Sequence, residues 1–270
     1  MHPVSGRRSG LPPTVLAGAA FLAAALSCGE VPTLPDGVAY ISSVILPSPA
    51  VALDDTLRDS LGVVAPIRLY GIDQSGDTVR TISPVFVVTT VPGKGVRLVA
   101  GDLVIGDSLR TVQIVGQVGS RLQTPPASLD VVRQPDSIAA ASNASARFPV
   151  PGTGEVTSAV SLGVTVTSPP NDPTPRSPVK SIIVRFSVTQ VFPADATIPD
   201  TTLVLLDEAG RFQLPTGRDA VDTTDASGNA SRRVRAIPLG FDSVEIRASA
   251  NDLRGVPLKG SPVRFVVTTK

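Results

Sequence analysis

The chain has 270 residues with one histidine, one cysteine, one methionine, no tryptophan and a formal net charge of +1. The only histidine is His2, so a chain that loses its leader has no imidazole for a Ser-His-Asp or Cys-His nucleophile or a His-ligated metal. Loss of Arg7 and Arg8 changes the charge to −1, which leaves no basic field to attract nucleic acid. Carboxylate-only and Ser-Lys chemistry remain open.

The N-terminal segment has the order of a secretory signal peptide. Two arginines precede an apolar run from Val15 to Leu26, and no acidic residue occurs before Glu30. The run has 12 residues, fewer than the roughly 20 that a membrane-spanning helix requires. We therefore expect residues 1–27 to be a cleaved signal peptide and residues 28–40 to be a tether.

Cys28 follows this run and is the only cysteine. The segment Ala25-Leu26-Ser27-Cys28 resembles the lipobox of bacterial lipoproteins, in which the cysteine is linked to diacylglycerol and becomes the new N-terminus. The resemblance implies lipidation of Cys28 and a place in the cell envelope, at the outer membrane or cell surface. Burial of acyl chains, at about 0.8 kcal/mol per CH₂, would then hold the protein on the membrane. The alternative is an incidental cysteine beside an ordinary signal-peptidase site after Ala25.

Beyond the tether, short runs of Val, Ile, Leu and Thr alternate with Gly, Pro, Asp and Ser clusters, as is typical of an all-β sandwich. The clearest alternation lies in residues 160–167, where the valines and the leucine share one face. Strands are predicted at residues 67–70, 85–88, 96–99, 112–115, 129–132, 160–167, 184–189 and 244–250. Turns with glycine are predicted at residues 73–77, 92–95 and 225–229.

A domain boundary is predicted at Arg133-Gln134-Pro135-Asp136, because proline cannot donate to a strand ladder. The first domain then spans residues 41–134 and the second spans residues 135–270. The segment 178–189 also aligns without a gap on 257–268. Recurrent strands of one design are typical of tandem β domains, so the repeat supports two sandwiches.

Residues 222–230 and 242–250 resemble the C-terminal half of bacterial Ig-like domains of the invasin and intimin type. In that family a Thr-Asp turn with glycine joins two strands ahead of a final Val-x-Ala strand. Residues 50–57 and 73–76 are similar to the other common group of bacterial Ig-like domains. The resemblance implies an all-β fold of two tandem Ig-like antiparallel β-sandwich domains, and a role in adhesion.

Asp222, Asp225 and Asn229 could converge on Ca²⁺, because hard cations take oxygen ligands from such turns. The same residue types are what a hairpin loop requires, so we expect no metal and no cofactor. Asp54 and Asp55, which precede Thr56, present the same two alternatives.

Arg232-Arg233-Val234-Arg235 is a short basic patch that could meet an anionic partner. Arg233 and Arg235 share one strand face and Arg232 faces the other way. We therefore expect a solvated edge strand, protected against aggregation by its charges.

These features predict a non-enzymatic cell-envelope lipoprotein that acts as an Ig-like adhesion, interaction or spacer module. Its partners would be a membrane, through the lipid on Cys28, and an unknown protein or surface ligand. Two alternatives stay open. The chain could be a structural accessory subunit of an envelope complex, or a hydrolase that depends on carboxylates.

Overall fold

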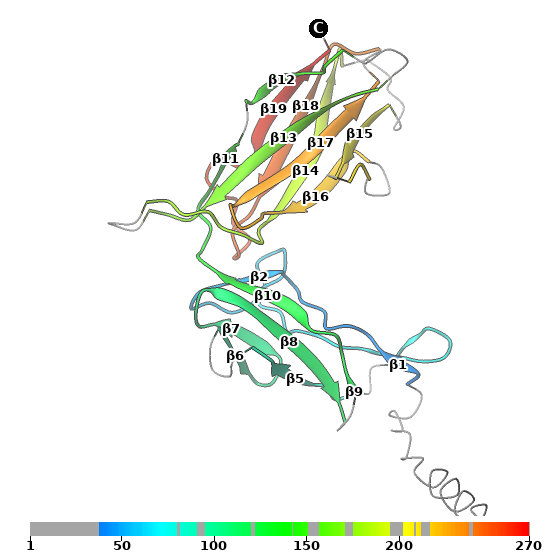
Figure 1. Ribbon diagram of the computed structural model, residues 1–270, viewed down its shortest axis with the longest axis vertical. Coiled ribbons are helices and arrows are strands. Elements are labelled where there is room, and N and C mark those ends of the chain that lie inside the picture. Colours follow the sequence, from blue (N-terminus) through cyan, green and yellow to red (C-terminus); the bar gives the residue numbers. More distant parts are fainter. Residues whose placement is uncertain are drawn as a thin grey trace, which may run out of the picture.

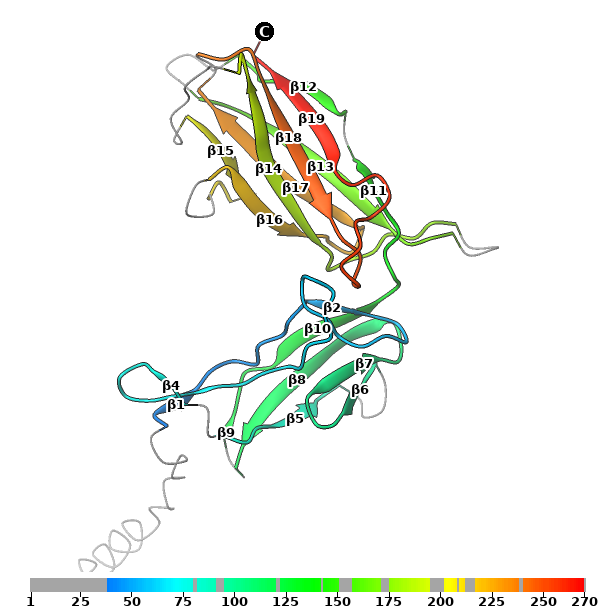
Figure 2. The ribbon, with the colours of Figure 1, turned by 180° about the vertical axis from the view of Figure 1, so that it is seen from behind.

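The computed structural model describes residues 38–79, 82–90, 95–119, 122–141, 143–150, 157–170, 175–194, 202–207, 209–211, 217–237 and 240–269. Two sandwiches follow one another along the chain (Figures 1 and 2). No helix occurs among the described residues, so none of them forms a helix long and apolar enough to cross a membrane. The all-β prediction is confirmed. The expected signal peptide at residues 1–27, Cys28 and most of the tether lie outside the described residues.

The first sandwich is built on one regular sheet. Its strands are β1 (Tyr40–Ile41), β2 (Ala50–Ala52), β3 (Gly71–Ile72), β4 (Thr78–Val79), β5 (Val85–Val88), β6 (Val96–Val99), β7 (Leu103–Gly106), β8 (Arg110–Val118), β9 (Leu122–Gln123) and β10 (Ala127–Val132). The main sheet has the order β2-β10-β8-β5, and β9 pairs with β8. The β6-β7 hairpin and the small β1-β3-β4 sheet complete this sandwich.

The core of the first sandwich follows from alternation along β8, where Val112 and Ile114 are fully buried and Gln113 between them is exposed. The predicted strand at residues 67–70 is less regular than expected. It has one bridge, between Ile45 and Arg68, and further backbone hydrogen bonds with Ser42 and Asp102, while ladder pairing begins only at β3. The predicted strands at 85–88 and 96–99 coincide with β5 and β6.

The second sandwich has two regular sheets. Its strands are β11 (Ser137–Ala140), β12 (Ser145–Arg147), β13 (Ser158–Thr167), β14 (Ile183–Phe192), β15 (Leu203–Leu206), β16 (Asp219–Thr223), β17 (Asn229–Ala236), β18 (Ser243–Ala250) and β19 (Val263–Thr268). One sheet has the order β11-β13-β17-β15 and the other the order β12-β19-β18-β14-β16. Strands β11-β13-β17-β15 match the ABED sheet of an immunoglobulin fold, and β14-β18-β19 match its CFG sheet.

Both sandwiches share a further feature of topology. A short early strand runs parallel to the last strand, β2 beside β10 and β12 beside β19. The other ladders are antiparallel, for instance β18 with β14 and with β19. Two tandem Ig-like sandwiches are therefore present, as the sequence predicted.

The core of the second sandwich confirms the alternation seen in residues 160–167. Leu162, Val164 and Val166 on β13 are fully buried, together with Phe186 on β14 and Phe265 on β19. Burial of one side chain of this size contributes about 1.5–3 kcal/mol. The predicted strands at 184–189 and 244–250 lie within β14 and β18.

One five-residue turn, Asp-x-x-Gly-x, recurs through both sandwiches. Its copies occupy residues 59–63, 73–77, 207–211, 225–229 and 252–256. In each copy the Asp N–H donates to the carbonyl of the fifth residue, and the Gly N–H donates to the Asp carbonyl. The glycine has positive φ in every copy, between 73° and 89°. The sequence predicted two copies, at 73–77 and 225–229, while residues 92–94 of the third predicted turn lie outside the described residues.

The internal repeat has a different origin from the one expected. Segments 178–189 and 257–268 both belong to the second sandwich, where β14 and β19 flank β18 in one sheet. The repeat therefore does not mark two tandem domains, and that part of the prediction was wrong. It arises because both segments pair with the same central strand, and each buries the phenylalanine at the same position of the repeat, Phe186 or Phe265.

Candidate functional site

The candidate site is the joint between the two sandwiches, where the turn at 59–63 meets the turn at 252–256. A Cβ added to Gly62 would lie 2.0 Å from the backbone oxygen of Arg254. One added to Gly255 would lie 2.4 Å from the backbone oxygen of Leu61. Such distances are too short for any side chain, so the two turns meet backbone to backbone and only glycine fits at either place.

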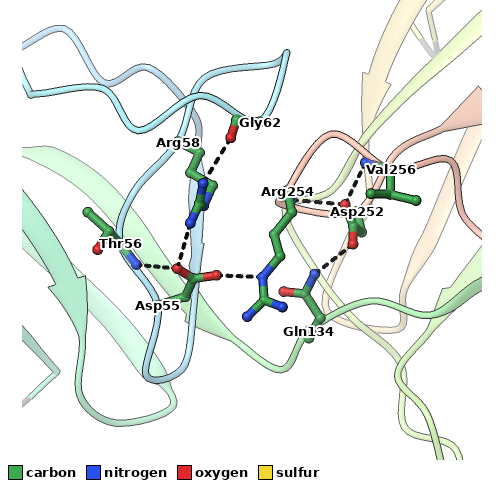
Figure 3. Close-up of polar contacts among 8 residues, drawn as sticks. All are labelled: Asp55, Thr56, Arg58, Gly62, Gln134, Asp252, Arg254 and Val256. Carbon is green, nitrogen blue, oxygen red and sulfur yellow. Dashed lines mark hydrogen bonds and ion pairs between the residues drawn. The ribbon is translucent and has the colours of Figure 1, made fainter.

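Asp55 lies beside these turns and connects them (Figure 3). Its Oδ2 accepts a hydrogen bond from Arg254 Nε at 2.8 Å, and its Oδ1 accepts from Arg58 Nη2 at 3.2 Å. Arg58 Nη1 in turn donates to the carbonyl of Gly62 at 3.0 Å. Burial alone would raise the pKa of Asp55, but the hydrogen bonds from Arg254, from the Thr56 N–H and from Arg58 lower it below its usual value.

The segment that links the sandwiches is bound to the same place. Gln134 Nε2 donates to Asp252 Oδ2 at 3.0 Å. The other oxygen of Asp252 accepts from the N–H groups of Arg254 and Val256, at 2.9 and 2.8 Å, and so closes the turn (Figure 3). Arg133–Asp136 connects β10 with β11. The domain boundary set between residues 134 and 135 stays a prediction.

A second polar contact crosses the joint at Asp130 on β10. Lys180 Nζ lies 2.6 Å from its Oδ1, and Ser181 Oγ donates to its Oδ2. Ser181 has φ of 62°, a left-handed conformation that residues other than glycine adopt only where their surroundings impose it. Burial alone would raise the pKa of Asp130, but the hydrogen bonds from Lys180, Ser181 and Thr111 lower it. Asp130 on the first sandwich therefore binds both Lys180 and Ser181 of the second.

Ion pairs hold the end of the linking segment on the second sandwich, and apolar contacts cross the joint. Lys259 Nζ lies 2.8 Å from Asp136 Oδ1, and Arg176 Nη1 lies 2.7 Å from Asp136 Oδ2. The hydrogen bonds from Lys259 and Arg176 lower the pKa of Asp136. Ala50 on β2 and Val132 on β10 belong to the hydrophobic cluster of the second sandwich. The two domains therefore share apolar contact as well as ion pairs.

A cleft of about 270 Å³ opens beside this contact. Residues of both sandwiches line it, and they include polar, charged and apolar side chains. The lining residues include Ser48, Ser60, Leu61, Ile183, Arg185 and Ser249. Sites for small ligands often lie at domain interfaces, so this cleft belongs to the candidate site.

The predicted calcium ligands lie together on one open depression of the second sandwich, and each has a structural partner. Asp225 Oδ1 accepts from the N–H groups of Ser227 and Asn229, which closes its turn. Asn229 Oδ1 accepts from Thr165 Oγ1 at 2.7 Å. Asp222 Oδ2 accepts from the Ser231 N–H at 2.8 Å. In the part of the chain that is described, no three His, Cys, Asp or Glu side chains are arranged to hold a metal ion.

The arginine patch differs from the expectation. β17 pairs with β13 on one side and β15 on the other, so it is not an edge strand. The predicted division of faces is correct, because Arg232 is 7% exposed and Arg233 is exposed. Arg232 lies 3.2 Å from Asp222 and donates to the carbonyls of Ser231 and Val221.

Sequence reasoning found Asp55 only as a weak calcium candidate and missed Arg254, Gly62 and Gly255. The signal for the two glycines was present, since both belong to the recurrent Asp-x-x-Gly-x spacing. No local pattern distinguishes a turn that faces water from one that faces another domain.

No protein-family model matches the chain, and no curated protein matches its sequence. Solved structures are similar to it in fold. Adhesin InvE of Yersinia pseudotuberculosis is 18% identical, with a TM-score of 0.36 over 88% of this chain and 62% of that one. Domains 4 and 5 of the S-layer protein SbsC are 12% identical, with a TM-score of 0.28 over 85% and 96%. The D00-D0 domain of intimin is 14% identical, with a TM-score of 0.23 over 83% and 98%. This chain thus spans 62% of the adhesin's length.

Proposed function

We propose that the chain is a non-enzymatic, two-domain Ig-like module of the cell envelope that works as a spacer or interaction module with a fixed angle between its sandwiches. The observation that carries this proposal is the joint. Independent motion is the default for neighbouring domains unless the interface holds them. Here the turns at 59–63 and 252–256 touch through their backbones, and polar contacts at Asp55 and Asp130 flank them.

The carboxylates of the joint do not suit the role of general acid in a hydrolase. A general acid in carboxylate-dependent hydrolysis needs a raised pKa, so that it carries a proton at neutral pH. Asp55, Asp130 and Asp136 have lowered pKa values because each binds cationic side chains. They are therefore structural ion-pair partners.

Two spin labels would test whether the angle is fixed. Gln74 and Ser161 are exposed and lie on different sandwiches. Gln74→Cys and Ser161→Cys in a Cys28→Ser background allow both sites to be labelled specifically, because Cys28 is the only native cysteine. We expect a single narrow distance distribution by pulsed electron spin resonance. A broad distribution, equal to that of two freely jointed domains, would contradict the proposal.

Membrane attachment through Cys28 is the second part of the proposal, and the position of this lone cysteine after the apolar run supports it. Cys28→Ser should release the protein from the membrane fraction, and the wild type should carry the mass of a diacylglycerol group. Retention of Cys28→Ser in membranes, with no acyl mass on the wild type, would falsify the anchor.

A further inference from the structure

Three arginines lie on the outer face of the sheet β14-β18-β19. Arg185 and Arg264 occupy the same position in the two copies of the internal repeat, so they stand on the strands that flank β18. Arg247 on β18 pairs directly with Arg264, and Ser249 on β18 pairs with Arg185. All three arginines are exposed, while Phe186 and Phe265 beside them in sequence point into the core.

Two like charges directly opposite one another on a sheet repel, and Glu245 relieves this repulsion. Its side chain is only 3% exposed although it lies on the outer face. Glu245 Oε1 accepts from Arg247 Nε at 2.8 Å and Oε2 accepts from Arg264 Nε at 2.6 Å. The hydrogen bond from Arg247 and that from Arg264 lower the pKa of Glu245, so its carboxylate stays ionised at neutral pH.

This arrangement leaves the far ends of both guanidinium groups available. Arg247 and Arg264 use only Nε, and their side chains are 51% and 61% exposed. Among the described residues, their Nη atoms and the side chain of Arg185 have no hydrogen-bond or ion-pair partner. The two Nη groups of an arginine form a planar fork that matches the oxygens of an anion.

The local charge suits a dianion. Three arginines and Glu245 together carry a formal charge of +2. Asp219 on β16 pairs with Ser187 and accepts a hydrogen bond from its hydroxyl, and Asp59 and Asp252 line the cleft on the side of Arg185. The arginine side chains are already oriented by Glu245, so less rotamer entropy is lost when an anion binds.

We propose that Arg247 and Arg264, oriented by Glu245 and supported by Arg185, form a binding site for a phosphate group on the outer face of the second sandwich. The site gives a ligand class to the interaction module proposed above, and to that extent it rests on that function. Arg185 and Ser249 also line the cleft at the joint, so the site is continuous with the cleft. The alternative is that Arg247, Arg264 and Glu245 only neutralise one another on the sheet and bind no ligand.

Titration of the full chain with inorganic phosphate tests the proposal. The Nε–Hε signals of arginine in a ¹⁵N spectrum report on Arg247 and Arg264 directly. We expect saturable shifts of these two signals at millimolar phosphate, and at least tenfold weaker binding in Arg264→Gln, in which an amide replaces the guanidinium. Arg233→Gln is the matched control, because it removes an exposed arginine from the opposite sheet and should leave the titration unchanged. A cooperative unfolding transition in each variant would show that both are folded at the temperature of the titration.

Vesicles distinguish the source of the phosphate group. These tests use the Cys28→Ser chain, so that a lipid on Cys28 does not itself bind the vesicles. Co-sedimentation with phosphatidic acid vesicles but not with phosphatidylcholine vesicles, lost when Arg264→Gln is added, would assign the site to a lipid headgroup. Phosphate binding without co-sedimentation would assign it to a soluble phosphate group. Equal shifts with acetate or with chloride at the same ionic strength, or full binding by Arg264→Gln, would overturn the site. None of these outcomes depends on the angle between the sandwiches, so the two proposals fail separately.

Discussion

The turns at 225–229 and 252–256 have the same spacing and the same internal hydrogen bonds, but only the second contacts the other sandwich. Asp225 and Asp252 each accept from the N–H groups two and four residues later. The first turn joins two strands within the second sandwich. The second faces the first sandwich, where its glycine meets the backbone oxygen of Leu61. Local chemistry therefore sets the shape of the turn, and only the surrounding chain gives it a function.

The largest expected effect is a difference in unfolding free energy between Gly255→Ala, at the joint, and Gly76→Ala, in a turn that faces water. Gly255→Ala requires a Cβ 2.4 Å from Leu61 O at a φ of 82°, whereas Gly76, at a φ of 89°, has nothing within 4 Å of that position. Both variants suffer a left-handed penalty of about 1–2 kcal/mol. Gly255→Ala suffers a further penalty of about 1–3 kcal/mol from steric overlap. Urea unfolding measures the difference, and equal costs for the two variants would show that the turns do not touch.

A smaller effect is expected when the aspartate of a turn is removed. Asp225→Ala and Asp252→Ala each lose two backbone hydrogen bonds, and each bond contributes about 1 kcal/mol of stability. Only Asp252→Ala also releases Gln134 of the linking segment. We therefore expect similar unfolding free energies, but a broader distance distribution between spin labels for Asp252→Ala alone. Broadening in Asp225→Ala as well would remove the distinction between the two turns.

The smallest effect is the response of the joint to acid. The folded pKa values of Asp55 and Asp130 are lowered, so their ion pairs stabilise the joint above the ordinary aspartate pKa. That stability is lost as the pH falls through the folded pKa values, below about 4. Arg254 is 59% exposed, so the contribution of its pair is about 0.2–1 kcal/mol.

Spin-label distances should stay constant from pH 7 to pH 5 and broaden below about pH 4. Arg254→Gln serves as the control, because it removes the cationic partner of Asp55 and should weaken the dependence on pH. Constant distances down to pH 3 would show that the ion pairs do not hold the angle.

Sequence patterns predicted the regular parts of the fold because those parts depend on local periodicity. Alternation in residues 160–167 and the burial of Phe186 follow from a strand with one face in the core. The segment 67–70 was predicted less well, since tertiary contacts hold it without regular pairing. The role of Asp55 could not be predicted, because its partner Arg254 lies 199 residues further along the chain.

The linking segment Arg133–Asp136 is held at both of its ends by equivalent lysines of the repeat. Lys180 binds Asp130, just before the segment, and Lys259 binds Asp136, its last residue. The number of residues between these two ion pairs is therefore fixed by the distance between Lys180 and Lys259 on the second sandwich. One residue inserted within it would force the chain to give up one of these contacts or to bulge away from Asp252. Length at this place is as much a part of the joint as the identity of its side chains.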